Sequence, residues 1–266
     1  MGPRPLDNWA NADRYHAYVG RWSALVAREF LGWLGAPNGG RWLDVGCGPG
    51  TLVEAVLERC APRDVVGVDP SEGFLAAARG RVSDRRASFV VGTAERLPPD
   101  LEKFDGVVSG LVLNFVPDTA AAVAEMTRVT RPDGVVGAYV WDYADGMQLM
   151  RYFWDAAAEL DPAAAAFDEG RRFPRFGSER LPALMGAHLS DVVSTGIVVE
   201  TPFADFDDYW RPFLGGQGPA PSYAMSLDEK ARHRLRDVLL ARLPTAPDGT
   251  IALTARAWAV KGTRPA

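Results

Sequence analysis

The stretch Leu43-Asp44-Val45-Gly46-Cys47-Gly48-Pro49-Gly50-Thr51-Leu52 decides the fold. Its apolar start predicts a strand, its three glycines predict a sharp turn, and the apolar spacing that follows predicts a helix. Glycine lets the backbone turn tightly and approach a ligand where any Cβ would intrude. A glycine-rich turn from strand to helix is typical of the carboxyl edge of an open α/β sheet, where such sheets bind ligands.

Short apolar runs alternate with helical patterns on both sides of this turn. Strands are predicted over residues 42–45, 65–68, 87–91, 104–108 and 134–140, with helices between them. Continuous apolar strands separated by helices indicate a parallel sheet that is buried on both faces. Right-handed crossovers then predict a Rossmann-like, doubly wound α/β layer.

The two flanks add further elements to this layer. Apolar residues at helical spacing over 22–34 predict an amphipathic helix before the first strand. Later segments predict a helix over 147–160, a sixth strand over 192–199, a helix that begins with the capping-box spacing of Ser226 and Glu229, and an alternating closing strand over 250–260.

No internal repeat and no linker divides the chain, so we expect a single domain. It would comprise an N-terminal helical lid (1–40), a cofactor-binding core (41–141), and substrate-side helical insertions with the closing strands (142–266).

The composition is that of a globular protein. Of the 266 residues, 47% are hydrophobic, and none of the apolar runs approaches the ~18 residues of a membrane span. The net charge of −5 lacks the excess of Lys and Arg that nucleic-acid binding requires, so we expect no nucleic-acid partner. Two cysteines are too few for a disulfide framework, which favours a cytoplasmic location.

Two carboxylates accompany the glycine-rich turn. Asp44 precedes it by two residues, and Asp69 ends the next predicted strand. A carboxylate in the second place can accept both hydroxyls of a ribose, which indicates a nucleoside or nucleotide ligand. A dinucleotide would bring a pyrophosphate that Asp44 repels, whereas S-adenosylmethionine carries an ammonium and a sulfonium. The charge of Asp44 therefore favours S-adenosylmethionine.

In combination, these motifs resemble those of class I S-adenosylmethionine-dependent methyltransferases, especially the ubiquinone/menaquinone-methyltransferase-like group (types 11 and 25). The motifs that carry the resemblance are Leu43 to Gly50, Asp69, Gly92 to Pro98, Phe104-Asp105 and Arg131 to Gly134. The resemblance implies about seven strands, mostly parallel with an antiparallel last strand. It also implies methyl transfer from S-adenosylmethionine to an unidentified acceptor (O-, N- or C-methylation), with S-adenosylhomocysteine as the product.

The resemblance also implies a cofactor site. Asp44 would lie near the amino group, and Asp69 would bind the ribose. The turn at Gly46, Cys47 and Gly48 would wrap the methionine moiety. The adenine would be bordered by Pro70, Thr93, Ala94 and Glu95. The floor of the cofactor site would be formed by Ser109, Gly110 and Leu111. A lid over the cofactor would include Tyr15 and Arg21.

Acceptor-side candidates follow the fourth and fifth predicted strands. Asn114, Phe115 and Trp141 are candidates for substrate contact, and Asp142 or Tyr143 for taking or orienting a proton. For Asp142, an N-cap of the 147–160 helix is an equally open interpretation. Aromatic residues over 173–176 and 203–213 either wall a substrate pocket or pack within the insertions. The three histidines lack metal-ligand spacing, so we expect no metal.

Other functions stay open at this point. An NAD(P)-dependent oxidoreductase would share the glycine-rich turn, but it needs a hydride-transfer partner such as a Tyr-x-x-x-Lys pair, which the sequence lacks. A non-catalytic S-adenosylmethionine-binding protein, or an enzyme that modifies tRNA or protein, would carry the same motifs. We expect a small-molecule substrate, and the motifs specify no oligomeric state.

Overall fold

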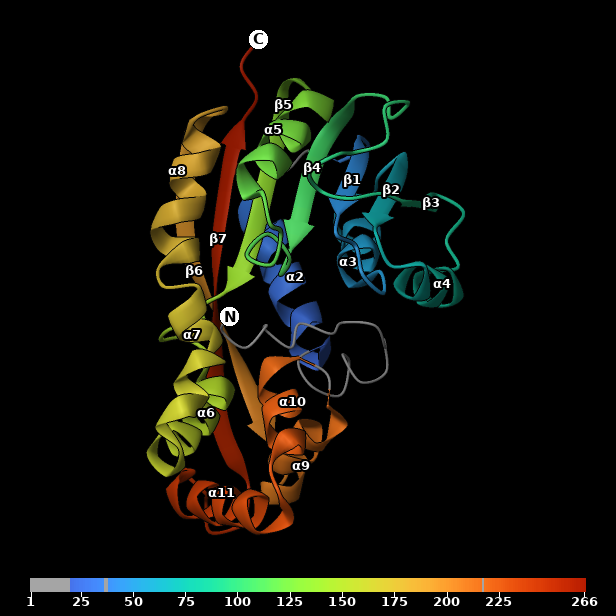
Figure 1. Ribbon diagram of the computed structural model, residues 1–266. Helices are drawn as coiled ribbons and strands as arrows, with labels where there is room; N and C mark the ends of the chain where they lie inside the picture. The colour runs from blue at the N-terminus through green and yellow to red at the C-terminus, as the bar shows by residue number, and fades with distance from the viewer. Residues whose placement is uncertain (1–19, 36–37, 217) are drawn as a thin grey trace. The chain divides into compact units, whose positions relative to one another are not determined.

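The computed structural model describes residues 20–35, 38–216 and 218–266 (Figure 1). Contacts divide them into two compact units. The first, called the sheet unit here, comprises residues 23–141, 175–197 and 257–266. The second, called the helical unit, comprises residues 142–174 and 198–256 together with residues 20–22.

A seven-stranded sheet in the order β3-β2-β1-β4-β5-β7-β6 forms the core of the sheet unit, and β6 and β7 contribute residues to both units. The strands are β1 (Arg41–Val45), β2 (Asp64–Asp69), β3 (Ala87–Val91), β4 (Phe104–Gly110), β5 (Thr130–Trp141), β6 (Ser190–Phe203) and β7 (Ile251–Thr263). Strands β1 to β5 pair in parallel, and β7 pairs with β5 in the antiparallel sense. The predicted Rossmann-like sheet, with its antiparallel last strand, is confirmed.

Burial along the strands follows their position in the sheet. The central strands β1 and β2 are buried at nearly every residue, as their continuous Val-rich runs predict. Strand β3 has an equally apolar sequence, but it lies at the edge, and Val90 and Val91 are exposed. Edge position therefore decides the exposure of β3, and composition does not.

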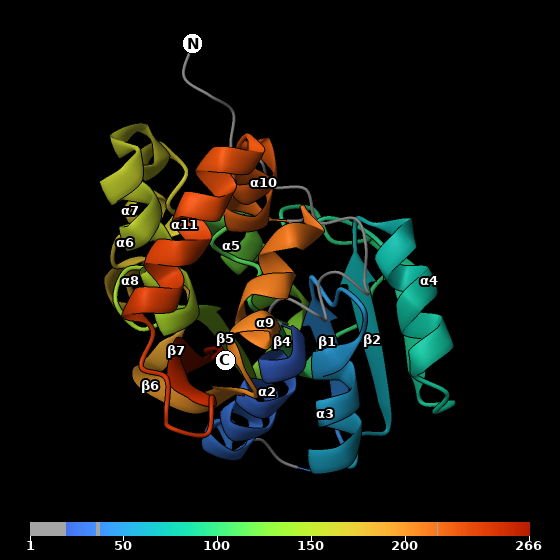
Figure 2. The same cartoon turned by 90° about the horizontal axis from the view of Figure 1, so that it is seen from below.

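Helices cover the sheet on both faces. In the sheet unit these include α2 (Arg21–Leu34, with its first two residues in the helical unit), α3 (Thr51–Arg59), α4 (Glu72–Arg81), α5 (Thr119–Val129), η3 (Phe176–Arg180) and α8 (Leu181–Gly186). Helices α2 and α3 lie on one side of β1 and β4, and α5 lies on the other (Figure 2). The predicted amphipathic helix is α2, whose Phe30 packs on Tyr139 with ring centroids 4.7 Å apart.

The helical unit has an aromatic core. Its helices are α6 (Gln148–Leu160), η2 (Pro162–Ala166), α7 (Glu169–Arg172), α9 (Phe206–Trp210), η4 (Arg211–Gly215), α10 (Pro219–Ser226) and α11 (Glu229–Arg242). Phe153 stacks on Phe213 at 4.4 Å, and Phe203 meets Tyr209 edge-on at 5.3 Å. The aromatic residues over 203–213 thus pack against one another inside this unit, as one of the two interpretations predicts.

The predicted cap of one helix is wrong, and so is one of the two open interpretations of Asp142. Helix α11 begins after Asp228, whose side chain accepts a hydrogen bond from Ala231 N at 2.7 Å, while Ser226 ends α10 and donates to Tyr223 O. Asp228 caps the helix in place of Ser226 because its charged carboxylate accepts from the N–H group three residues further on, at the positive end of the helix dipole. Asp142 is likewise no N-cap, because Met147 occupies that position before α6.

In the described part of the chain, no helix combines the length and the apolar character that crossing a membrane requires.

Candidate active site

The turn between β1 and α3 needs its glycines. Gly46 and Gly48 have positive φ values of 75° and 52°. A Cβ on Gly46 would lie 2.6 Å from Val112 Cγ1, whereas Gly48 faces open space. The N–H groups of Gly46 and Cys47 both donate to Val68 O, at 2.7 and 3.0 Å. These bonds hold the turn against the carboxyl end of β2.

Asp69 links this turn to the start of α4. Its carboxylate accepts from Gly48 N at 2.9 Å and from Ser71 N at 2.8 Å. Burial raises the pKa of Asp69, and the two N–H groups oppose the rise. The side chain is therefore held rigidly at the position that the sequence assigned to ribose binding.

Asp44 is a buried carboxylate at the carboxyl end of β1. The residue is 1% exposed, and neither carboxylate oxygen finds a partner among the described residues. Burial raises the pKa of Asp44 well above its usual value, and the charge of Asp69 raises it further. An isolated buried carboxylate is costly, and a bound cationic group would remove that cost. This site therefore fits the ammonium of the predicted cofactor.

Cys47 packs toward the sheet. A Cβ on Gly67 of β2 would lie 2.8 Å from Cys47 Sγ, so the sulfur occupies the space that this glycine leaves. Burial raises the pKa of Cys47, and the charges of Asp44 and Asp69 add to the rise. The thiol therefore stays protonated, and only the backbone of Cys47 is available to a ligand in this turn.

The segment predicted to border the adenine is tied to the same edge. Gly92 N donates to Asp69 O at 3.2 Å, and Thr93 bridges to Arg96. Ala94 is buried and Glu95 half-buried, whereas Thr93 and Pro70 are exposed. The structure thus brings the segment after β3 next to the end of β2.

The residues at the carboxyl end of β4 differ in which of their groups a ligand could contact. Ser109 is fully buried and donates its hydroxyl to Val45 O at 2.7 Å, so only its backbone is left for a ligand. A Cβ on Gly110 would lie 2.5 Å from Tyr139 Oη. Leu111 has a φ of 63°, which is strained for a side chain of this kind, and its N–H donates to Tyr139 O at 2.8 Å.

The three substrate candidates lie in the sheet unit. Asn114 and Trp141 are 7% and 4% exposed. Neither polar atom of the Asn114 amide, nor Trp141 Nε1, has a hydrogen-bond partner within the described ranges. Phe115 is half-buried in the same turn as Asn114. Their contact with a substrate stays a prediction.

The remaining candidates lie elsewhere. Tyr15 falls outside the described residues. Arg21 belongs to the helical unit, where it pairs with Asp208 at 3.0 Å and stacks over Trp22 and Phe203. The predicted role of Arg21 in a lid is untested.

The two proton-transfer candidates also belong to the helical unit. Asp142 accepts from Arg256 Nε at 2.7 Å and from Asp145 N at 3.2 Å. Tyr143 is 5% exposed, and its ring lies 6.3 Å from that of Phe173. The ion pair gives Asp142 an evident structural role, and a catalytic role for either residue stays a prediction.

Three features of the site escape sequence reasoning. Val112 packs against Gly46, and the Tyr139 hydroxyl lies beside Gly110. Arg256 donates a hydrogen bond to Asp142, which is 114 residues away in the sequence. An apolar residue in a loop and an arginine in an alternating strand carry no local signal of these contacts. For Tyr139, the sequence predicts a place in the buried strand over 134–140, but it does not predict the contact with Gly110.

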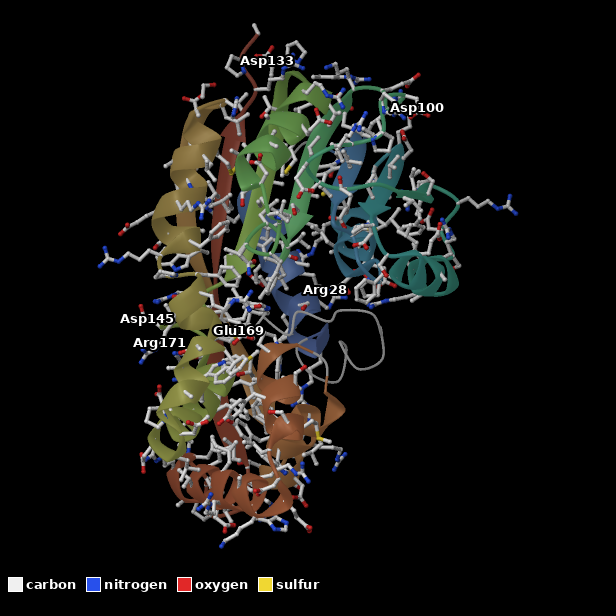
Figure 3. The ribbon with its side chains drawn as sticks, viewed as in Figure 1. Arg28, Asp100, Asp133, Asp145, Glu169 and Arg171 are labelled. Atoms are coloured by element: carbon white, nitrogen blue, oxygen red, sulfur yellow. The ribbon has the colours of Figure 1, made fainter. Side chains whose placement is uncertain are left out.

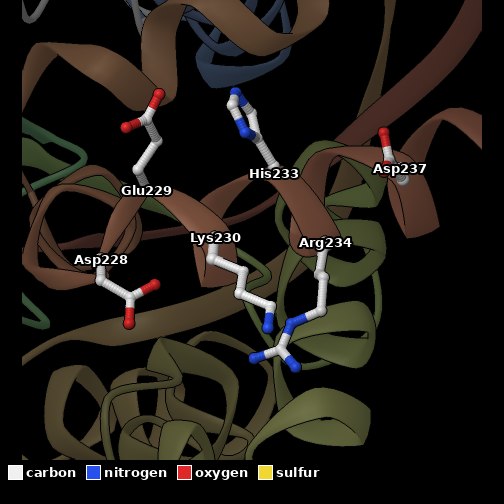
Figure 4. A pocket seen from close by; sticks show the side chains of 6 residues that line it. All are labelled: Asp228, Glu229, Lys230, His233, Arg234 and Asp237. Carbon is white, nitrogen blue, oxygen red and sulfur yellow. The ribbon is translucent and has the colours of Figure 1, made fainter.

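A polar depression on α11 is a weaker candidate. It is lined by Asp228, Glu229, Lys230, His233, Arg234 and Asp237. Figure 4 shows Glu229 and His233 pointing to one side of the helix and Lys230 and Arg234 to another, so the side chains do not converge. Within the described ranges, no group of three or more His, Cys, Asp or Glu residues is arranged to hold a metal ion.

The sheet order, the glycine-rich turn after β1 and the carboxylate at the end of β2 define a Rossmann-like α/β fold. Residues 43–137 match the family model described as "Methyltransferase domain". The resemblance to class I S-adenosylmethionine-dependent methyltransferases is thereby confirmed for this part of the chain.

A curated protein is similar to part of the chain. The demethylmenaquinone methyltransferase of Roseiflexus castenholzii is 39% identical over 100 residues, which is 38% of this chain and 42% of that protein. The chain thus aligns with less than half of the length of this relative.

Two solved structures share the fold. A protein of Anaeromyxobacter dehalogenans assigned as a type II methyltransferase has a TM-score of 0.63 at 22% identity, over 90% of this chain and 97% of that one. Phosphoethanolamine N-methyltransferase 2 of Haemonchus contortus, in complex with phosphomonomethylethanolamine and S-adenosylhomocysteine, has a TM-score of 0.59 at 17% identity. That match covers 96% of this chain and 57% of the other.

Proposed function

We propose that this protein transfers a methyl group from S-adenosylmethionine to a small-molecule acceptor at the carboxyl edge of β1, β2, β4 and β5. The observation that carries the proposal is the buried carboxylate of Asp44 beside the glycine-rich turn, for which residues 20–35, 38–216 and 218–266 supply no hydrogen-bond partner. A pyrophosphate placed there would be repelled, so a dinucleotide does not fit. The bound complex of the Haemonchus contortus neighbour supports the same cofactor on this fold.

The chain's own residues bind and orient in this scheme. Asp44 would hold the ammonium, Asp69 the ribose hydroxyls, and Gly48 would leave the backbone open to the ligand. The bound cofactor supplies a methyl carbon that is activated by a sulfonium. A lone pair of the acceptor forms the new bond to that carbon, while the electron pair of the carbon–sulfur bond returns to sulfur. Alignment and exclusion of water are then the main tasks of the protein.

The cysteines bear on the location. Cys47 and Cys60 are buried free thiols. Buried free thiols are typical of proteins that work in reducing compartments, which supports the cytoplasm as the site of action.

Calorimetry with S-adenosylhomocysteine tests the site. Asp44→Asn removes the charge that pairs with the ammonium, and Asp69→Asn weakens the acceptor for the ribose. We expect each to weaken binding at least ~10-fold, because hydrogen bonds to charged groups contribute about 1.5–3 kcal/mol. The matched control is Asp237→Asn, whose side chain is 73% exposed on α11 and which should bind like the wild type. Unchanged affinity in both site variants would refute the assignment.

A labelled-methyl experiment tests the acceptor class. Incubation with S-adenosylmethionine carrying a tritiated methyl group, and with a metabolite extract, tRNA or cell protein, should place the label in the metabolite fraction. Label recovered only in tRNA or protein would contradict a small-molecule acceptor.

A further inference from the structure

Two buried polar side chains of the sheet unit are not used by the cofactor assignment. The Asn114 amide and Trp141 Nε1 have no hydrogen-bond partner among the described residues, at 7% and 4% exposure. More than about 90% of buried polar groups in proteins are paired, because an unpaired one costs about 1–3 kcal/mol. Two such groups at one edge of the sheet indicate a ligand that pairs with them.

The backbone places Asn114 between the ends of β1 and β5. Leu111 N donates to Tyr139 O at 2.8 Å, and Phe115 N donates to Val112 O at 2.8 Å. Val112 in turn is the residue whose side chain packs against Gly46. The turn that carries Asn114 therefore lies between the glycine-rich turn and the last residues of β5.

Trp141 lies on the same face of the sheet as Asp44. Register pairs in a sheet share a face, and so do alternate residues of one strand. Asp44 pairs with Val108, which alternates with Gly110, and Gly110 pairs with Tyr139, two residues before Trp141. The Asp44 carboxylate and the Trp141 indole thus both lie at strand ends on the α2 face of the sheet.

The two groups together offer more donors than acceptors. The indole has one N–H and no acceptor, and the amide has two N–H donors and one carbonyl acceptor. An ammonium only donates, so it would leave Trp141 Nε1 unpaired. A negatively charged oxygen accepts hydrogen bonds from either group, and such hydrogen bonds are the stronger kind.

We propose that Asn114 and Trp141 hold the methyl acceptor through an oxygen that carries full or partial negative charge, such as a phenolate, enolate or carboxylate oxygen. The inference rests on the proposed function, because it assigns these residues to the acceptor of that reaction. It makes them specificity-determining residues that favour oxygen-bearing acceptors over aliphatic amines.

Trp42 offers a matched control. Its Nε1 also lacks a partner within the described ranges, and the residue is 1% exposed. It is, however, the second residue of β1, and its ring packs beside Gly106, so it lies toward the amino ends of the strands. Trp42→Phe removes a buried indole N–H in the same way as Trp141→Phe, but away from the predicted acceptor position.

The test uses the full chain saturated with S-adenosylhomocysteine. Benzoate, 4-nitrophenolate and the enolate of acetylacetone are titrated against benzylamine, and the indole N–H resonances are followed by NMR. At least one oxygen probe should shift the resonance that is absent from Trp141→Phe. Its affinity should fall ~10-fold or more in Trp141→Phe and in Asn114→Asp, and should stay within ~2-fold in Trp42→Phe. Asn114→Asp should also gain affinity for benzylamine, because it replaces two donors by acceptors.

Several results would overturn the inference. The first is that no oxygen probe binds the wild type. The second is that both site variants bind the oxygen probe as tightly as the wild type does. The third is that the wild type binds benzylamine more tightly than every oxygen probe. The affinity for S-adenosylhomocysteine is measured for every variant. If one variant loses it, the other carries the test, and if both lose it, the two side chains support the fold or the cofactor and the inference is wrong. A wild type that fails to bind S-adenosylhomocysteine refutes the proposed function. If that protein still binds an oxygen probe, and Trp141→Phe loses this binding, the result supports Asn114 and Trp141 as a binding site for oxygen-bearing compounds.

Discussion

Single residues at the proposed site adopt backbone conformations or degrees of burial that few other side chains would tolerate. Gly46 and Gly48 occupy left-handed backbone, Leu111 does so despite its side chain, and Asp44 is buried with no hydrogen-bond partner among the residues that the structure describes. Such strain is found at functional sites because the surrounding structure enforces it. The backbone conformations of these residues predict which single substitutions the fold tolerates.

Gly46→Ala should destabilise the protein by about 2–4 kcal/mol, because a Cβ adds left-handed strain and overpacks against Val112. Urea denaturation measures this loss. In a double-mutant cycle with Val112→Ala, the overpacking share should disappear and about 1–2 kcal/mol of backbone strain should remain. Gly48→Ala, where the space is open, is the control that carries the backbone strain alone. Equal losses in Gly46→Ala and Gly48→Ala would show that Val112 imposes no steric limit.

At the scale of elements, one buried carboxyl connects two helices of the helical unit. Trp154 of α6 donates its Nε1–H to Glu169 Oε2 of α7 at 2.6 Å, and Glu169 is 1% exposed. Figure 3 shows Glu169 among the helices of this unit. Burial raises the pKa of Glu169 to about 7, and the Trp154 hydrogen bond opposes the rise.

This raised pKa predicts a pH dependence of stability. Between the unfolded value of about 4.3 and a pH of about 7, the folded protein keeps a proton that the unfolded chain releases. The contribution of this group to stability should therefore be fully present below the unfolded value and should be lost as the pH rises to about 7, by about 3–4 kcal/mol. Glu169→Gln should remove that part of the slope.

Urea midpoints at pH 5 and pH 8 measure the effect. Asp44 and Asp69 also have raised pKa values, so the wild type keeps other sources of slope. The difference between Glu169→Gln and the wild type at the two pH values isolates Glu169. The same slope in both proteins would mean that Glu169 is ionised in the fold at pH 5.

At the scale of the whole molecule, binding at one edge of the sheet should stabilise the chain. S-adenosylhomocysteine at 100 times its dissociation constant adds about 2.7 kcal/mol, because it binds only the folded state. For a chain of this size we expect a rise of about 5–10 °C in the melting temperature. Calorimetric melting checks this, with Asp237→Asn shifting like the wild type and Asp44→Asn shifting less. A rise of equal size in Asp44→Asn would place the ligand elsewhere.

Local sequence patterns account for most of the elements. The strand Ala87–Val91 is predicted to the residue, and helix α6 to within one residue, because apolar periodicity is a property of neighbouring residues. Long-range contacts account for the differences. Strand β6 extends beyond its predicted range at both ends, to Ser190–Phe203, since pairing within the sheet supplies what its own pattern does not.

The sequence by itself determined the sheet, the glycine-rich turn and the two carboxylates beside it, because strand periodicity and glycine spacing are local. Only the tertiary structure decided which side chains are left without partners. Asp142 finds Arg256 114 residues away, and Ser109 finds Val45, whereas Asp44, Asn114 and Trp141 find no partner in the described part of the chain. Burial and pairing depend on residues that are distant in sequence, so no local pattern reveals them.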